Sequence, residues 1–338
     1  MPVYNVQDYV IRCLISLINQ DIPATEYDII VINDGSIDNT EEIAKSYGNR
    51  IRYFFKENGG TPSALNMGIE NMRGEYFAWL SHDDMYYPRK IEREVDELSK
   101  LPNKETIMLS NYETIDENYK LIARIHVEDL IADYPKREFS KYFHVLFSTM
   151  HCCCLIPKKC FEIVGVFDVN WRVAHDHEFL YRILANFPHK LIPEILLTAR
   201  DSPNRQGRRA KLRCNVEYSL LLISIMEKLT DDDILLMQPS KELFYLSMKN
   251  ALSAIGWSIG AEYSDVIYQS LKIDILPALP DQPQEEPVDQ NPVSQSPVNQ
   301  GSVNQDHRHS IFGIVYMSIK QYGLRNTIIR IFKKIFRH

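Results

Sequence analysis

The 338-residue chain lacks the features that mark a membrane-spanning or disulfide-stabilised protein. No stretch reaches the roughly 18–20 uninterrupted apolar residues that a membrane-spanning helix needs. The N-terminus has no basic segment followed by an apolar run and a cleavage site, so we expect no signal peptide. The six cysteines form no CxxC pair, which favours neither a disulfide scaffold nor a structural zinc site. We therefore expect a reducing, cytoplasmic compartment.

Acidic residues are missing from one part of the chain. The formal net charge is −7, yet residues 311–338 contain six basic side chains and no acid. The rest of the chain is therefore more acidic than the whole. Because phosphate contacts need clustered lysine and arginine, this acidic body is a poor general binder of nucleic acid. We expect no nucleic-acid partner, and the basic C-terminus needs its own explanation.

Strand-like and helix-like segments alternate over about the first 110 residues. Residues 27–32 form a β-branched run typical of a strand covered on both faces. Two similar strands are predicted over 51–55 and 75–80. The helices between and after them are predicted over 9–19, 39–47 and 88–100. This rhythm predicts an α/β fold with a central, mostly parallel sheet between helices.

Residues 1–5 resemble the end of a first strand and its loop. We therefore expect most of that strand to be absent from this sequence, which would leave unpaired backbone inside the sheet. Further strands are predicted over 106–125, 149–156 and 190–198, and a helix over 174–187. Cys152, Cys153 and Cys154 are predicted to pack as small residues within the second of these strands.

The C-terminal third changes character twice. Residues 206–276 are predicted to form a helical extension. Residues 277–309 hold six of the 17 prolines among Gln, Asn and Ser, which predicts a disordered linker. Residues 310–338 are predicted to form a basic amphipathic helix, because apolar and basic stripes recur at helical spacing.

Four short polar segments follow the predicted strands, at residues 2–5, 33–36, 57–60 and 81–84. Ligands of α/β sheets bind outside the carboxyl ends of the strands. Each segment alone is weak evidence, since Asn-Asp-Gly-Ser is also a common turn. Their order and placement together predict a ligand site at this edge of the sheet.

Five motifs make the sequence similar to the family 2 glycosyltransferases, which have the GT-A nucleotide-sugar-binding fold. They are Met-Pro-Val-Tyr-Asn, Val-Ile-Asn-Asp-Gly-Ser, Asn-Gly-Gly-Thr-Pro-Ser-Ala-Leu-Asn, Trp-Leu-Ser-His-Asp-Asp, and Gly-Val-Phe-Asp followed by His-Asp-His-Glu. The resemblance covers residues 1–205 and implies a GT-A domain there.

By this resemblance, Asp83 is the main ligand of a divalent metal ion and Asp84 an auxiliary one. Mg²⁺ or Mn²⁺ would offset the charge that develops on a nucleoside diphosphate as the sugar leaves. Such hard cations take few protein carboxylates and keep water and phosphate ligands. Ser81 stands where the family has its first Asp, so a contact of that Asp is in question. The alternative is that the two acids cap the helix that starts near Pro88.

The resemblance also implies a nucleotide pocket. Tyr4 would offer a ring for stacking on the base, and Asp34 would accept a base N–H. Four further residues are assigned to donor binding: Pro2, Asn66, His82 and Arg208. Arg208 belongs, with Arg200 and Arg209, to a predicted loop after the 190–198 strand that could close over the diphosphate. The alternative for that loop is a solvated surface segment.

Asp176 is the predicted general base, because the acceptor hydroxyl must lose a proton as it attacks the anomeric carbon. It corresponds to the family's catalytic Asp, and His175 replaces the usual Glu before it. A one-step displacement assisted by this base inverts the anomeric configuration. The alternative is a helix N-cap. The spacing of His175, His177 and Glu178 does not favour a zinc site on one helix face.

These inferences predict a metal-dependent, inverting glycosyltransferase. We expect a nucleotide-sugar donor, with UDP-sugars favoured, and a glycan or lipid-linked glycan acceptor. The basic C-terminal helix is expected to hold the protein at the anionic inner face of the cell membrane; docking of this helix on protein is the alternative. A second hypothesis is a catalytically degenerate nucleotide-sugar-binding or scaffold protein. A dinucleotide-dependent dehydrogenase is disfavoured, because no GxGxxG motif follows the first strand.

Overall fold

The structure is a computed structural model that describes residues 1–132, 151–201 and 210–273. The predicted linker and C-terminal helix lie outside these residues. The strands are β1 (Pro2–Val3), β2 (Ile30–Asn33), β3 (Arg52–Phe55), β4 (Tyr76–Ala78), β5 (Met85–Tyr86), β6 (Ile107–Ile115), β7 (Leu121–Ile125), β8 (Leu155–Pro157) and β9 (His189–Arg200). The helices are α1 (Val10–Ile18), α2 (Thr40–Lys45), α3 (Thr61–Asn71), α4 (Lys90–Ser99), α5 (Val127–Ala132), α6 (Lys158–Val164), α7 (His175–Asn186), α9 (Lys211–Met226), α10 (Asp231–Met237), α11 (Lys241–Ala254) and α12 (Ser258–Ile273), with 3₁₀ turns η1 (Gly48–Arg50) and η4 (His151–Cys153).

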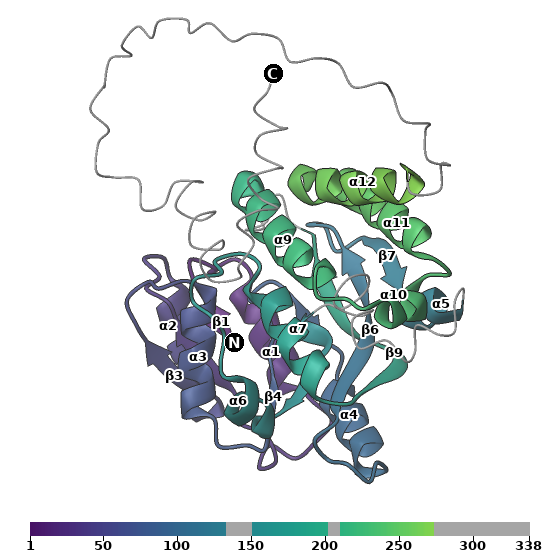
Figure 1. Cartoon of the computed structure of the whole chain (residues 1–338). Helices are drawn as coiled ribbons and strands as arrows, with labels where there is room; N and C mark the ends of the chain where they lie inside the picture. The colour runs from purple at the N-terminus through teal and green to yellow at the C-terminus, as the bar shows by residue number, and fades with distance from the viewer. Residues whose placement is uncertain (133–150, 202–209, 274–338) are drawn as a thin grey trace, which may run out of the picture.

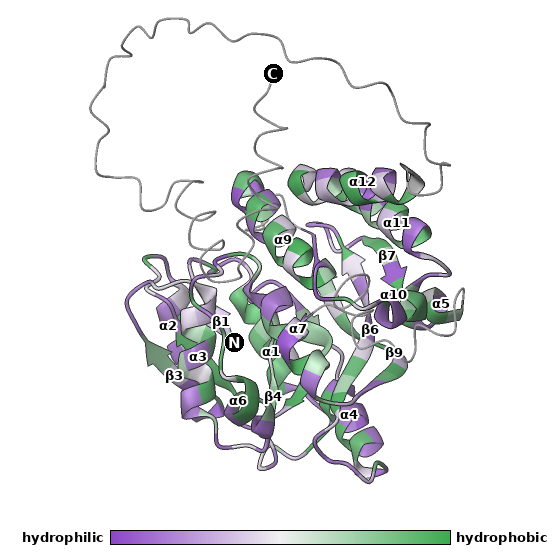
Figure 2. Ribbon diagram, viewed as in Figure 1, coloured by the Kyte–Doolittle hydropathy of each residue, from purple (hydrophilic) through white to green (hydrophobic). Residues whose placement is uncertain are grey.

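The first sheet has the order β1-β2-β3 and is parallel throughout. Val31 and Ile32 of β2 are almost fully buried, as expected for a strand covered on both faces. Helices α2 and α3 lie beside this sheet (Figure 1). Figure 2 shows α1 as a largely hydrophobic helix, and its Val10 and Leu14 pack in the same core as Val31.

The second sheet has the order β4-β8-β6-β9-β5, and β7 pairs with β6. Only β6 and β9 are parallel among its described pairs, whereas the other pairs are antiparallel. The α/β class predicted from the sequence is confirmed. The predicted parallel pairing occurs in the first sheet and between β6 and β9. The other strand pairs of the second sheet are antiparallel.

The segment around the three cysteines differs from the prediction. Cys152 and Cys153 lie in the 3₁₀ turn η4, and the strand β8 begins only at Leu155. The turn is closed by a hydrogen bond from the backbone nitrogen of Cys154 to the carbonyl of His151 at 3.2 Å. All three thiols are buried, so their predicted packing role holds although the strand assignment does not.

A cavity of about 210 Å³ separates the two sheets. It is lined by β2 on one side and β4 on the other, through residues such as Ile30 and Phe77. The short β1 ends at this cavity, where the backbone nitrogen of Met1 donates to the carbonyl of Ile30 at 2.7 Å. Among the described strands, β4 pairs only with β8.

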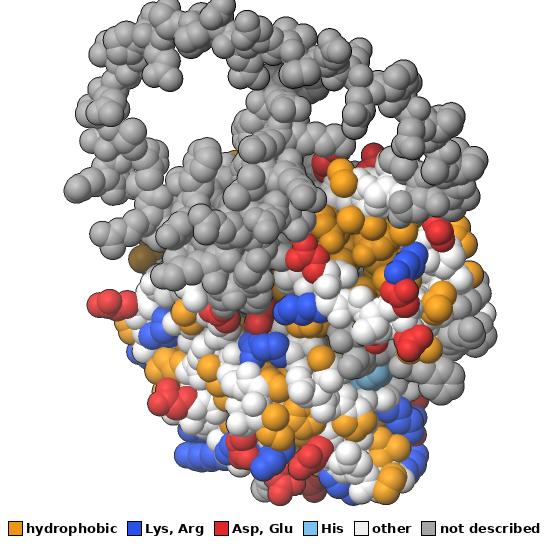
Figure 3. All heavy atoms as spheres, viewed as in Figure 1, with side chains coloured by type: hydrophobic (Ala, Val, Ile, Leu, Met, Phe, Trp, Pro, Cys, Tyr) orange, Lys and Arg blue, Asp and Glu red, His pale blue; other side chains and the backbone are white. Residues whose placement is uncertain are grey.

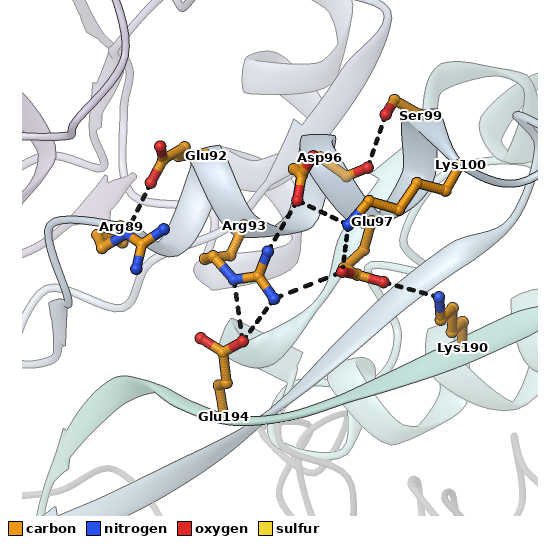
Figure 4. Close-up of polar contacts among 9 residues, drawn as sticks. All are labelled: Arg89, Glu92, Arg93, Asp96, Glu97, Ser99, Lys100, Lys190 and Glu194. Atoms are coloured by element: carbon orange, nitrogen blue, oxygen red, sulfur yellow. Dashed lines mark hydrogen bonds and ion pairs between the residues drawn. The ribbon is translucent and has the colours of Figure 1, made fainter.

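Helix α4 is fastened to β9 by ion pairs on its outer face (Figure 4). Arg93 contacts Glu194 at 2.6 Å, and Glu97 contacts Lys190 at 2.8 Å. Hydrogen bonds from Lys100 and Lys190 lower the pKa of Glu97 to about 2. On the inner face, Lys90 and Glu94 form a fully buried ion pair. The outer ion pairs join α4 to β9, whereas the buried pair lies within the helix itself.

Residues 211–273 form α9 to α12, of which α9, α11 and α12 lie in the upper part of the coloured ribbon in Figure 1. Their apolar residues share one core cluster with α7, which includes Phe179, Leu180, Leu220 and Phe244. Within the described residues, no helix combines the length and apolarity that crossing a bilayer requires. On the face shown in Figure 3, basic and acidic side chains of the described residues are intermixed.

Candidate active site

Asp34 lies at the carboxyl end of β2 and anchors the loop that follows β3. Only 3% of its surface is exposed. Its Oδ1 accepts hydrogen bonds from Lys56 Nζ at 2.7 Å and from the backbone nitrogen of Gly59 at 2.9 Å. Its Oδ2 accepts one from the backbone nitrogen of Gly60 at 2.8 Å. Because a carboxylate offers about four lone-pair positions, Oδ2 keeps capacity for another donor, such as an N–H of a nucleotide base.

The turn after Asp34 requires glycine. Gly35 has a φ of +81°, and a Cβ atom at this position would lie 2.9 Å from the backbone nitrogen of Asn58. Both the dihedral angle and the close approach disfavour any residue with a side chain. Asn33 closes the same turn, since its Oδ1 accepts a hydrogen bond from the backbone nitrogen of Ser36 at 2.8 Å. The 33–36 motif thus brings the loops after β2 and β3 together.

The two aspartates after β4 have different surroundings. Asp84 is 2% exposed, and its Oδ1 accepts a hydrogen bond from the backbone nitrogen of Arg200 at 3.0 Å. Asp83 is half-buried, and its backbone carbonyl accepts a bond from Arg200 Nε at 3.4 Å. Neither caps α4, whose N-cap is Arg89. Asp83 therefore presents the more accessible carboxylate of the two.

A divalent cation fits the chemistry of this loop. Burial, then the charges of Asp84 and Asp83, raise the pKa of the nearby Cys13 thiol, so both carboxylates act on one region. Mg²⁺ and Mn²⁺ need only one or two carboxylates when phosphate and water oxygens complete the shell. Within the described residues, no three His, Cys, Asp or Glu side chains form a cage that could hold an ion alone. The loop suits an ion bound together with a diphosphate.

Asp176 lies in the first turn of α7, two residues after the N-cap Ala174. Its Oδ2 is 3.0 Å from Nδ1 of His151. Its Oδ1 accepts hydrogen bonds from the backbone nitrogen of His177 at 2.8 Å and from the Tyr218 hydroxyl at 3.2 Å. Burial alone would raise the pKa of Asp176, but His177 and His151 outweigh it and hold the pKa well below its ordinary value. Asp176 is therefore ionised, and the N-cap alternative does not hold.

Helix α9 of the helical extension contacts the start of α7 and the Asp176 carboxylate. Glu217 of α9 is 1% exposed, and its Oε2 accepts bonds from the backbone nitrogens of Val173 and Ala174 at 2.8 and 3.2 Å. These N–H groups precede α7 and have no partner inside the helix. Tyr218, the next residue of α9, reaches Asp176. Helix α9 thus fixes both the start of α7 and the position of the Asp176 carboxylate.

Two contacts join the strand-end loops to the Asp176 corner. Arg172 Nη1 donates to the carbonyl of Gly59 at 2.5 Å, which links the loop after β3 to the segment before α7. Ser81 Oγ lies 3.3 Å from His151 Nε2, which links the loop after β4 to Asp176. The structure therefore connects the predicted nucleotide, metal and acceptor residues in one region.

Three other predicted donor contacts occupy different settings. Tyr4 follows β1 and is 47% exposed, so its ring is accessible for stacking. Pro2 is buried within β1 and pairs in register with Ile32 of β2. His82 is half-buried, and burial lowers the pKa of its imidazole. Of the three, the ring of Tyr4 is the most open to a ligand.

Asn66 bridges two elements through both atoms of its amide. Its Nδ2 donates to the carbonyl of Phe167 at 2.8 Å, and its Oδ1 accepts from the nitrogen of Phe167 at 2.9 Å. Asn66 therefore fastens α3 to the segment before α7. Arg208 lies outside the described residues. The placement of Arg200 in a closing loop is wrong, because it belongs to β9 and is 2% exposed, with its guanidinium 4.2 Å from the Tyr119 ring centroid.

Sequence reasoning missed His151, Lys56 and Glu217. Lys56 stands directly before the 57–60 motif, so its position was a usable signal. His151 and Glu217 carry no local signal, because each meets its partner through tertiary contacts across 25 residues or more. His151 also stacks on Trp79, with ring centroids 3.9 Å apart.

The family model for "Glycosyl transferase family 2" matches residues 1–164. An uncharacterized glycosyltransferase of Rickettsia conorii is 41% identical over 256 residues, which cover 75% of this chain and 42% of the relative. Another, from Rickettsia typhi, is 39% identical over 246 residues, or 72% of this chain and 76% of the relative. The matched region thus spans about two fifths of the R. conorii protein and three quarters of the R. typhi protein.

Two solved structures share the fold. S. aureus TarS 1–349 in complex with UDP matches with a TM-score of 0.53 and 16% identity, over 75% of this chain and 70% of that chain. Mannosyltransferase PcManGT from Pyrobaculum calidifontis, in complex with GDP-Man and Mn2+, matches with a TM-score of 0.51 and 13% identity, over 81% and 79%. At these identities the likeness concerns the GT-A fold alone.

Proposed function

Because this chain belongs to the family 2 glycosyltransferases, we propose that it transfers a sugar from a nucleotide-diphosphate donor to a hydroxyl group. The acceptor is a glycan or a lipid-linked glycan, and the transfer inverts the anomeric configuration. One observation carries the proposal. The Asp34 cluster, the Asp83 loop and the ionised Asp176 are joined by the contacts of Arg172 and Ser81.

The donor is held on the strand-end side. Tyr4 stacks on the base, and Oδ2 of Asp34 accepts a base N–H. A UDP-sugar is favoured, in line with the UDP complex of TarS. Lys56 and Arg172 place positive charge beside the Gly59–Gly60 loop, where a diphosphate is neutralised.

Asp83, assisted by Asp84, would hold Mg²⁺ or Mn²⁺, as the Mn2+ complex of PcManGT supports. Such an ion supplies charge neutralisation for a diphosphate leaving group. The chain's own part is to keep Asp83 accessible while Asp84 ties the loop to β9 through the nitrogen of Arg200. This arrangement fixes the loop without consuming the carboxylate of Asp83.

The acceptor approaches from the α7 side, where Asp176, paired with His151, takes its proton. A base on the face opposite the leaving group favours a single displacement, and this geometry inverts the anomeric carbon. Helix α9 holds the pair in place through Tyr218 and Glu217. The helical extension is thereby part of the transferase unit.

A catalytically degenerate nucleotide-sugar-binding or scaffold protein is the second candidate. It is favoured by Ser81, which replaces an acid of the metal motif. The retained Asp83 and Asp176 weigh against it. The two candidates differ in turnover and agree in nucleotide binding.

Turnover with a panel of UDP-, GDP- and dTDP-sugars separates these candidates. We expect one donor to be consumed in the presence of Mn²⁺ or Mg²⁺, and Asp83→Asn to lower kcat/KM by about a hundredfold or more. Asp232→Asn, at an exposed position of α10, is the matched control and should keep full turnover. Nucleotide binding without consumption of any donor would favour the scaffold instead.

The basic C-terminal segment is the basis for a proposal about the location of the protein in the cell. We propose that the protein is cytoplasmic and peripheral, held on the anionic inner face of the cell membrane by residues 310–338. Each basic residue near anionic lipid contributes about 1 kcal/mol. Co-sedimentation with vesicles that contain anionic lipid should be lost when residues 311–338 are removed. Unchanged co-sedimentation would contradict this location.

A further inference from the structure

The turn between β6 and β7 holds a tyrosine in a backbone conformation that this residue rarely adopts. Tyr119 has a φ of +64°, in the left-handed region where a bulky side chain strains the backbone. The turn is closed by backbone hydrogen bonds from Tyr119 to the carbonyl of Asp116 at 3.1 Å and from Asp116 to that of Lys120 at 2.9 Å. Glycine would make the same turn without this strain. Such strain persists only where other contacts outweigh it, and the ring of Tyr119 makes contacts of this kind.

Two arginines cover the two faces of the Tyr119 ring. The guanidinium carbon of Arg12 lies 3.9 Å from the ring centroid, and that of Arg200 lies 4.2 Å from it. Two guanidinium groups at these distances cannot share one face, so they lie on opposite faces of the ring. Arg200 also lies 5.2 Å from the ring centroid of Tyr9. Cations and aromatic rings therefore alternate here, and their attraction offsets the strain of the turn.

Arg200 contacts the loop after β4 at both of its aspartates. Its backbone nitrogen donates to Asp84 Oδ1 at 3.0 Å, and its Nε donates to the backbone carbonyl of Asp83 at 3.4 Å. Its Nη1 donates to the carbonyl of Glu117 at 3.3 Å, in the same turn as Tyr119. Because an arginine side chain has many rotamers, the contacts of the guanidinium decide where Nε points. The turn between β6 and β7 supplies two of these contacts, the ring and the carbonyl.

Helix α1 contacts the same loop. Cys13 Sγ donates to the backbone carbonyl of His82 at 2.8 Å, and Arg12 is the residue before Cys13. The ring of Tyr119 therefore links α1, through Arg12, to the end of β9, through Arg200, and both elements hold the loop after β4. Tyr119 is 39% exposed, so its ring adds little to the core. What the ring determines is the placement of the two arginines.

We propose that Tyr119 is a positioning residue of the donor site, whose ring keeps Arg200 in the orientation that fixes the backbone of Asp83 for a divalent cation. The inference rests on the proposed transferase function and deepens it, because it adds a turn outside the strand-end motifs to the donor site. Groups behind a metal ligand orient that ligand, and their loss weakens metal binding. Without the ring, the loop has more conformations to lose when a cation and a diphosphate bind. The contacts of Asp34 lie elsewhere in the pocket and stay as they are.

Calorimetric titration of the full chain with UDP, with and without Mn²⁺, measures this role. In Tyr119→Gly, the factor by which Mn²⁺ strengthens UDP binding should fall about tenfold, while UDP binding without metal stays unchanged. Tyr119→Phe keeps both ring faces and should keep the full factor. Asn118→Ala, at an exposed position of the same turn, is the matched control and should also keep it. A wild-type factor that persists in Tyr119→Gly would overturn the proposal and leave the proposed function intact.

Hydrogen exchange of the metal-free protein tests the positioning role without any ligand. The amide of Arg200, which is bonded to Asp84, and the amides of residues 81–84 should exchange about tenfold faster in Tyr119→Gly. They should exchange at the wild-type rate in Tyr119→Phe and Asn118→Ala. Because glycine suits the left-handed turn, Tyr119→Gly should keep the melting temperature of the wild type. Equal exchange in Tyr119→Gly and the wild type would overturn the proposal, even if UDP did not bind at all.

A double-mutant cycle tests the link through both arginines. Arg12→Gln should lower the Mn²⁺ factor by about threefold, in the same direction as Tyr119→Gly. The double variant Arg12→Gln/Tyr119→Gly should lose no more than Tyr119→Gly alone, because both changes interrupt the same series of contacts. Fully additive losses would contradict the link, since Arg12 would then act independently of the ring.

Discussion

Replacing His175 with phenylalanine should make the protein more resistant to acid. Both ring nitrogens of His175 are buried without a hydrogen-bond partner, and the ring lies between Trp79 and Phe167. Burial lowers its pKa from 6.5 to about 4. Between these values the unfolded chain binds a proton that the folded chain does not. Stability is therefore complete above about pH 6.5 and is lost as the pH falls towards 4.

The size of this effect follows from the two pKa values. One pKa unit corresponds to about 1.4 kcal/mol, so at pH 5 the wild type has lost about 2 kcal/mol through His175. His175→Phe removes this loss and also the unpaired nitrogens. Urea unfolding of both proteins at pH 7 and pH 5 measures the change. A difference in unfolding free energy that stays constant, or shrinks, between pH 7 and pH 5 would refute the reasoning.

Three further changes test other parts of the structure. Glu94→Leu leaves the Lys90 ammonium buried without its partner and should cost about 3–5 kcal/mol, whereas Lys90→Met/Glu94→Leu should be close to neutral in urea unfolding, because both charges are then gone. Equal costs for the single and double variants would contradict this. Asp34→Asn turns an NH₂ group towards Lys56 or a glycine N–H, and should weaken UDP binding about tenfold by calorimetry, or about 1.4 kcal/mol. Glu217→Ala leaves two backbone N–H groups before α7 unpaired and should lower the unfolding free energy by about 2 kcal/mol; an unchanged value would remove the buttress role of α9.

Local signals were sufficient for β2, β3 and β4 and for the strand-end motifs. The β-branched run before Asn33 and the acidic pair after β4 predict where side chains leave the sheet, because strand-end placement depends on short stretches of sequence. Helix α7 begins at His175, next to the predicted residue 174. The direction of β5 and β8 could not be predicted in this way. It is set by pairing with β9 and with β4 and β6, which are distant in sequence.

The roles within the site depend on tertiary contacts that composition and spacing do not encode. Asp83 and Asp84 are neighbours in sequence, yet only the fold shows that the carboxylate of Asp84 accepts a hydrogen bond from the backbone nitrogen of Arg200. His151 follows no motif and reaches Asp176 through the turn η4. Asn66 belongs to a motif, but its amide is engaged by the backbone of Phe167. The motifs therefore predicted which loops form the site. The role of each side chain depends on its contacts in the fold.

Calorimetric titration of the full chain with UDP, with and without Mn²⁺, tests the central claim most directly. We expect UDP binding that strengthens when Mn²⁺ is present, and Asp83→Asn to abolish this strengthening while the binding seen without metal persists. Equal dependence on Mn²⁺ in the wild type and in Asp83→Asn would contradict the assignment of a metal-assisted donor site to the loop after β4.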